Sequence, residues 1–179
     1  MSANAASVKP SSAAPGTLVE EDFTRIFDQI KQSEYEIRWQ QEAGAYMAPN
    51  RAHNLRFSFH DDGVTVTPRK TTETPSWLAS VSLVSYGRVG FPSHTIEASS
   101  WSITQNTAEV QSSGLNIGYR NDKDGLRQDF LIQEKPAGKG MLRLDLLTEH
   151  RGVTMNVDAT ENIVFFANAK EEKVMRYSG

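Results

Sequence analysis

The chain holds 179 residues with a formal net charge of −3, from 19 Lys and Arg against 22 Asp and Glu, and it contains no cysteine. Its length suits one domain with a tail, and the lack of thiols excludes disulfide frameworks and thiolate metal sites. No block of basic residues stands out, so we expect no nucleic-acid partner.

The sequence carries no membrane-directed segment. No run approaches the 18 apolar residues of a membrane-spanning helix, and residues 1–16 lack the basic start and the apolar centre of a secretory signal peptide. We therefore expect no membrane span. If the protein is exported, we expect that the signal peptide is absent from this chain.

Residues 1–16 and 17–33 predict a disordered leader followed by a helix. The leader is rich in Ala, Ser, Pro and Gly, which bury too little apolar surface to offset their ordering entropy. Thr17 and Glu20 form a capping box, in which each side chain satisfies a free amide at a helix start. We expect the apolar face of this helix to dock on the sheet of its own domain; it consists of Phe23, Ile26, Phe27 and Ile30.

Residues 34–179 predict a β-rich domain. Short alternating segments and turn sequences follow one another, and the clearest is a hairpin of residues 55–59 and 64–67 around Asp61-Asp62-Gly63. The count is roughly eight to eleven strands. We expect a mainly β fold, an antiparallel sandwich or barrel-like arrangement with one N-terminal helix. The candidate strand that stops at Gly179 predicts a domain truncated at its C-terminus.

Four segments give more specific expectations. Residues 35–40 alternate and predict a strand, whereas residues 44–54 are irregular and predict a turn-like connection. Residues 114–147 hold two alternating segments, an acidic turn and a second turn at Pro136–Gly140, and predict three strands folded back on one another. The unbroken apolar run of residues 163–166 predicts a central buried strand.

Several of these segments resemble a known family. YEIRWQQEAGAYMAPNRAHNLRFSFHDDGVTVTPR, LVSYGRVG and AEVQSSGLNIGYRNDKDGLRQDFLIQEKPAGKGMLRLDL are similar to the N-terminal β-rich domain of large secreted bacterial proteins, which carry SBBP-type or FG-GAP-type β-propeller repeats. These proteins also have Ig-like modules and, in Bacteroidota, a C-terminal sorting domain. The resemblance covers residues 34–179 and implies an extracellular accessory domain without an established activity. The helix of residues 17–33 is not part of this pattern.

The acidic turn is a candidate calcium site. Asp122, Asp124 and Asp129 surround Gly125, and carboxylates at alternate positions can converge on a hard cation. The EF-hand pattern is incomplete, and an ordinary hairpin turn favours the same residues. Both interpretations stay open, and the same two apply to the Asp61-Asp62-Gly63 turn.

No catalytic signature is present, so we expect no enzyme. The four histidines are scattered without metal-ligand spacing and are predicted as surface residues: His53, His60, His94 and His150. A third hypothesis, a hydrolase with paired carboxylates, depends on contacts that one sequence does not show.

The aromatic residues and two arginines have structural and ligand-binding interpretations. Trp39, Trp77 and Trp101 could form a platform for sugar rings, although their alternating contexts favour core packing. Arg88 and Arg127 are expected to anchor loops through carbonyl or carboxylate oxygens.

The sequence therefore predicts a non-catalytic structural or interaction module of an exported or cell-surface bacterial protein. The alternative is a ligand-binding module for carbohydrate or calcium, with no other cofactor expected. The expected partners are other domains of the same exported protein, or a protein or glycan.

Overall fold

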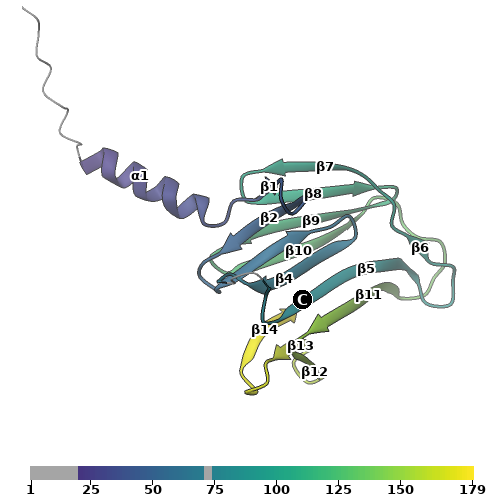
Figure 1. The fold of residues 1–179 in the computed structure, drawn as a ribbon. Coiled ribbons are helices and arrows are strands. Elements are labelled where there is room, and N and C mark those ends of the chain that lie inside the picture. The colour runs from purple at the N-terminus through teal and green to yellow at the C-terminus, as the bar shows by residue number, and fades with distance from the viewer. Residues whose placement is uncertain (1–19, 71–73) are drawn as a thin grey trace, which may run out of the picture.

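The computed structural model describes residues 20–70 and 74–179, and in this part the chain is mainly β, with fourteen strands in antiparallel sheets and one short helix (Figure 1). This confirms the predicted mainly β, antiparallel class with one helix. The predicted leader, residues 1–16, and the predicted start of the helix lie outside the described residues. The strand count exceeds the expected one because two strands are only two and three residues long and because a strand forms in residues 45–50, where a turn was expected.

The first and largest sheet has seven strands. Its order is β1-β2-β3-β4-β5-β11, and β6 pairs with the far end of β5. The strands are β1 (Arg38–Gln40), β2 (Ala45–Asn50), β3 (Leu55–Phe59), β4 (Gly63–Pro68), β5 (Leu78–Arg88), β6 (His94–Thr95) and β11 (Leu142–Arg151). The predicted hairpin is confirmed as β3 and β4.

Two smaller sheets complete the β structure. The second has the order β10-β9-β8-β7, with β7 (Ala98–Thr104), β8 (Thr107–Ser112), β9 (Leu115–Asp122) and β10 (Gly125–Ile132). The third has the order β12-β13-β14, with β12 (Thr154–Asp158), β13 (Ile163–Ala167) and β14 (Lys173–Ser178). The apolar run of residues 163–166 is central in this sheet, as expected, but of its four residues only Phe166 is fully buried. None of the sheets closes into a barrel within residues 20–70 and 74–179.

The second and third sheets both pack on one face of the first. Phe59 of β3 meets Tyr119 of β9 with ring centroids 5.1 Å apart. His150 of β11 meets the fully buried Phe166 of β13 at 5.9 Å. His150 pairs with Ala79, Ala79 with Val66, and Val66 with Phe57. Directly paired residues point to the same side of a sheet, as do residues two apart on one strand, so His150 lies on the same face as Phe59. One continuous core therefore joins all three sheets.

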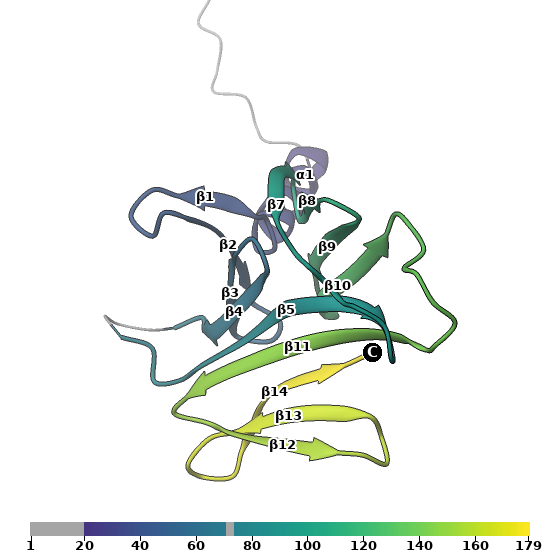
Figure 2. The same ribbon diagram turned by 90° about the vertical axis from the view of Figure 1, so that its right-hand side faces the viewer.

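The predicted strand pairing of residues 114–147 is only half correct. β9 and β10 form the expected hairpin, but β11 leaves them and pairs along β5 (Figure 2). The physical reason lies in the connection: the Arg88 guanidinium donates to the carbonyl of Pro136 at 3.1 Å and to that of Gly140 at 2.6 Å. These bonds hold the β10–β11 loop at the end of β5.

Two other local expectations are corrected. Only Arg38–Gln40 of the segment 35–40 is a strand, and Ala45–Asn50, expected to be turn-like, forms β2. Proline is tolerated in a strand where its missing N–H is not needed for the ladder. Pro49 pairs with Arg56 in β2 and uses its carbonyl to accept a bond from the Asn121 amide at 2.9 Å.

The helix α1 (Glu20–Ser33) stands away from the sheets (Figure 1). Its apolar residues are exposed, with Phe27 at 59% and Ile30 at 51%. The expectation that this face docks on the domain's own sheet is therefore wrong for this structure. Amphipathic spacing identified the apolar face correctly but does not determine what covers it.

Candidate functional site

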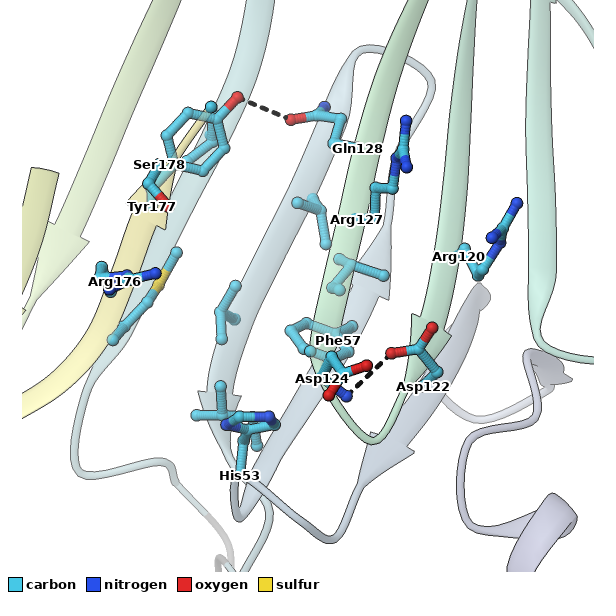
Figure 3. A pocket seen from close by; sticks show the side chains of 18 of the residues that line it. His53, Phe57, Arg120, Asp122, Asp124, Arg127, Gln128, Arg176, Tyr177 and Ser178 are labelled. Carbon is cyan, nitrogen blue, oxygen red and sulfur yellow. Dashed lines mark hydrogen bonds between the residues drawn. The ribbon is translucent and has the colours of Figure 1, made fainter. Parts of the chain in front are cut away.

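A cavity of about 1170 Å³ lies where the edges of the second and third sheets face each other (Figure 3). Its floor belongs to the first sheet and is apolar, formed by Leu55, Phe57, Val64, Val66 and Val81. Phe57 and the three valines are buried in the core. The remaining lining comes mainly from consecutive residues of β10 and of β14.

The walls of the cavity are strand edges. β10 pairs only with β9, and β14 pairs only with β13, so within the described part of the chain no ladder joins β10 to β14. The side chains of consecutive residues point to opposite faces of a strand. When consecutive residues all line one cavity, the backbone at the edge of the strand must therefore border it. The site therefore presents main-chain donors and acceptors on two sides of an apolar floor.

The free hydrogen-bonding groups of β10 follow from its register with β9. Gln133 N–H donates to the Gly114 carbonyl at 2.9 Å, and hydrogen-bonded pairs recur at every second residue of an antiparallel ladder. Arg127 and Asp129 therefore bond to β9. The residues that alternate with them, Leu126, Gln128 and Phe130, direct their N–H and C=O groups to the cavity edge.

One side-chain contact bridges the two edges. The Tyr177 hydroxyl donates to Gln128 Oε1 at 3.2 Å, and Gln128 Nε2 donates to the Tyr119 hydroxyl at 3.2 Å. Burial raises the pKa of both tyrosines, and Asp62 and Tyr177 raise that of Tyr119 further. The two phenols are therefore neutral at physiological pH and act as hydrogen-bonding groups.

The rim of the cavity carries more unpaired cations than unpaired anions. Arg127 pairs with Asp129 at 2.8 Å, and Asp124 pairs with Lys123 outside the cavity lining. The other basic residues of the rim, Arg120, Lys173 and Arg176, form no ion pair within residues 20–70 and 74–179. Lys173 instead lies over the Phe165 ring, 4.3 Å from its centroid.

The turn between β9 and β10 is held against the first sheet by buried amides. Asn50 Nδ2 donates to Asn121 Oδ1 and to the Asp122 carbonyl, each at 2.8 Å. His53 Nε2 lies 3.0 Å from the Lys123 carbonyl. This network positions the lower end of β10, beside which Asp124 and His53 lie (Figure 3).

The predicted calcium residues lie on this turn and on β10. Asp122 Oδ1 accepts the Asp124 backbone N–H at 2.9 Å, which is an ordinary turn contact. Asp129 faces away from the core beside Arg127. No group of three or more metal-ligating side chains gathers in the described ranges. Calcium binding at these residues stays a prediction.

The three tryptophans have three different environments. Trp77 is buried as expected, with 7% exposure, but Trp39 is 51% exposed, so the expectation of core packing is wrong for it. Trp39 meets Tyr46 edge-on at 5.1 Å and 73°, and Tyr46 meets the half-buried Trp101 at 5.4 Å and 37°. These inclined rings do not form the flat platform expected for a sugar site.

Most of the remaining predicted residues lie where the sequence suggested. All four histidines are exposed, and Arg88 anchors a loop through carbonyls. The expectation that Arg127 anchors a loop is wrong, because it pairs with Asp129 on its own strand β10. Sequence reasoning missed Gln128 and Tyr177, which meet across the cavity although 49 residues separate them. Only their positions on alternating strands were visible in the sequence.

No helix in the described ranges is long and apolar enough to cross a membrane. Comparison of the chain with protein-family models, with curated proteins and with solved structures finds no match.

Proposed function

We propose that this chain is a non-catalytic interaction module that binds a polypeptide in the cavity between β10 and β14. The single observation that carries the proposal is a cavity with an apolar floor and two walls made of strand edges. Apolar sites with a few convergent polar groups are the usual binding sites of proteins. Backbone walls favour a ligand that itself has a backbone.

The proposal includes a finer description of the fold, a sandwich in which the second and third sheets form one interrupted layer over the first. The contacts of Tyr119 and of Phe166 on one face of the first sheet support it. It also includes export to the bacterial cell surface, which rests on the resemblance of the quoted segments. Secretion of the chain from its host, measured by cell fractionation, tests that part separately.

The test is a selection of random dodecapeptides displayed on phage against the full chain. Leu126 lines the cavity, and Leu126→Arg places a charge at the cavity wall. Leu131 lies on the same strand, is 62% exposed and is outside the lining, so Leu131→Arg is a matched control. Circular dichroism establishes that both variants are folded.

We expect selected peptides to bind the wild-type chain and Leu131→Arg alike, and to bind Leu126→Arg at least tenfold more weakly. A selection without enrichment, or equal binding to all three proteins, would overturn the proposal. The alternative ligands are tested by thermal unfolding with calcium, a chelator and soluble glycans, since a ligand of the folded state raises its stability. If calcium or a glycan raises the unfolding temperature and no peptide is selected, the peptide proposal is wrong and that ligand takes its place.

A further inference from the structure

We infer that the ligand of the cavity is an extended strand that inserts between β10 and β14 and pairs with both. This inference rests on the proposed function and names the class of partner: a segment of another polypeptide with apolar residues at alternate positions and acidic residues between them. With this strand in place the second and third sheets would form one continuous layer, β7-β8-β9-β10-strand-β14-β13-β12.

The first argument is the hydrogen bonding of the two edges. Leu126, Gln128 and Phe130 direct N–H and C=O groups away from β9 and toward the cavity. Unpaired edge groups are a template for another strand, and peptides commonly bind by adding a strand to a free edge. Here two such edges border one cavity, so an inserted strand would be bonded on both sides.

The second argument is direction. Figure 3 shows Asp124, in the turn that leads into β10, below Gln128 of β10, and Arg176 below Ser178 on β14, so the two strands run the same way. A strand of opposite direction would therefore be antiparallel to both neighbours. This pattern continues the rest of the structure, in which all pairings are antiparallel across the described residues.

The third argument is the pattern of side chains that such a strand needs. Its inward residues would contact the apolar floor around Val64, Val66 and Val81. Its outward residues would lie between Arg127 and Arg176, which are both exposed. Opposite charges on neighbouring strands stabilise a sheet, and Arg176 has no carboxylate partner in the described part of the chain. Acidic residues at the outward positions fit this rim.

The Tyr177 contact with Gln128 spans the two edges between which the strand would insert. Both side chains are neutral, and they meet at 3.2 Å without any ladder between their strands. A neutral hydrogen bond of this kind contributes little net stability because water can replace it. The contact can therefore open when a strand enters.

The test uses the full chain and a fluorescein-labelled heptapeptide of alternating glutamate and valine, with blocked ends. Hydrogen exchange is followed by NMR for single backbone amides. At saturating peptide we expect the amides of Leu126, Gln128 and Phe130 to exchange at least tenfold more slowly. The amides of Arg127 and Asp129, already bonded to β9, serve as internal controls and should change little. Unchanged exchange at the three edge amides would overturn the inference.

Two altered peptides separate backbone pairing from simple apolar binding. A peptide with N-methyl groups on every second residue keeps its side chains but loses half of its N–H donors. One such peptide is methylated at its odd-numbered residues and a second at its even-numbered residues. We expect the weaker of the two to bind at least tenfold less tightly than the unmethylated heptapeptide. If both methylated peptides bind the chain as tightly as the unmethylated peptide does, strand insertion is overturned. A lysine–valine peptide should bind at least tenfold more weakly at low salt, and equal binding would overturn the acidic assignment.

A variant pair tests the rim. Arg176→Glu should weaken binding of the glutamate–valine peptide at least fivefold. Arg151→Glu, at the end of β11 and outside the cavity lining, should leave it unchanged. Equal effects of the two substitutions would contradict a specific contact at the rim.

The outcomes also distinguish other occupants and the failure of the parent proposal. If the three edge amides are already protected without peptide, a second copy or another segment of the chain fills the cavity, and the inference of a partner strand is overturned. If selected peptides depend on Leu126 but leave the edge amides unprotected, the proposed function stands and strand insertion fails. If no peptide is selected and the heptapeptide does not bind, both fail.

Discussion

Asn50 and Asn121 are both completely buried, and the Nδ2 group of Asn50 donates to Oδ1 of Asn121 at 2.8 Å. The Asn121 amide in turn donates to the carbonyls of Tyr35 and Pro49. These bonds join the second sheet to the first and to the segment that enters it from α1. A buried polar network of this kind stabilises a fold only while its members are satisfied.

Asn121→Ala removes the centre of this network. Asn50 keeps its bond to the Asp122 carbonyl but loses the one to Asn121, and the carbonyls of Tyr35 and Pro49 lose the donor that Asn121 supplies. Because an unsatisfied buried polar group costs about 1–3 kcal/mol, we expect the free energy of unfolding to fall by at least that amount. Urea unfolding of the purified chain measures it. Asn156→Ala is the control, since its amide bonds only to the Thr154 carbonyl on the same strand. Equal losses in the two variants would contradict the role of the network.

Arg88→Met tests the anchor that directs β11 to β5. The substitution keeps an apolar stem but removes the bonds to the Pro136 and Gly140 carbonyls. Hydrogen bonds from charged groups contribute about 1.5–3 kcal/mol, and we expect a loss of stability in this range with faster amide exchange in β11. Arg143→Met breaks only an exposed ion pair with Asp145 and should cost less than about 1 kcal/mol. A loss as large in Arg143→Met would argue against the anchor.

Gly63→Ala tests the close approach of β4 to β5. A Cβ at Gly63 would lie 2.1 Å from the Val81 carbonyl oxygen and 2.7 Å from Ser82 Cα. Overpacking of this kind typically costs about 1–3 kcal/mol or more, because backbone must move. Gly118→Ala is the matched strand control, with its nearest contact at 3.9 Å. Thermal unfolding should show a clear loss for Gly63→Ala alone, and a similar midpoint in both variants would refute the steric reason.

The buried tyrosines predict a loss of stability in alkaline solution. Burial raises the pKa of Tyr119 and of Tyr177 in the folded chain above the ordinary value of about 10. Above pH 10 the unfolded chain releases these protons first, so the free energy of unfolding falls as pH rises toward the folded pKa. Their contribution is fully present below pH 10.

Urea unfolding between about pH 8 and pH 11.5 measures this effect. The double variant Tyr119→Phe with Tyr177→Phe should show a shallower fall above pH 10 than the wild-type chain. An unchanged slope would show that other groups cause the alkaline loss.

The sequence by itself determined the class of this protein and its local hairpins. Period-two alternation and the turns at Asp61-Asp62-Gly63 and before Gly125 specify β3–β4 and β9–β10, because turn type and short-range register are local properties of the chain. The helical spacing and the exposed setting of the four histidines were likewise predicted correctly.

The tertiary structure alone decided which distant strands meet. β11 pairs with β5 rather than with β10, and Arg88 supports this arrangement by binding carbonyls of residues about 50 positions further along the chain. The same holds for Gln128 and Tyr177, and for the cavity between their strands. Alternation reveals which side of a strand is buried, but long-range packing selects its neighbours, and that packing also left Trp39 and the apolar face of α1 exposed.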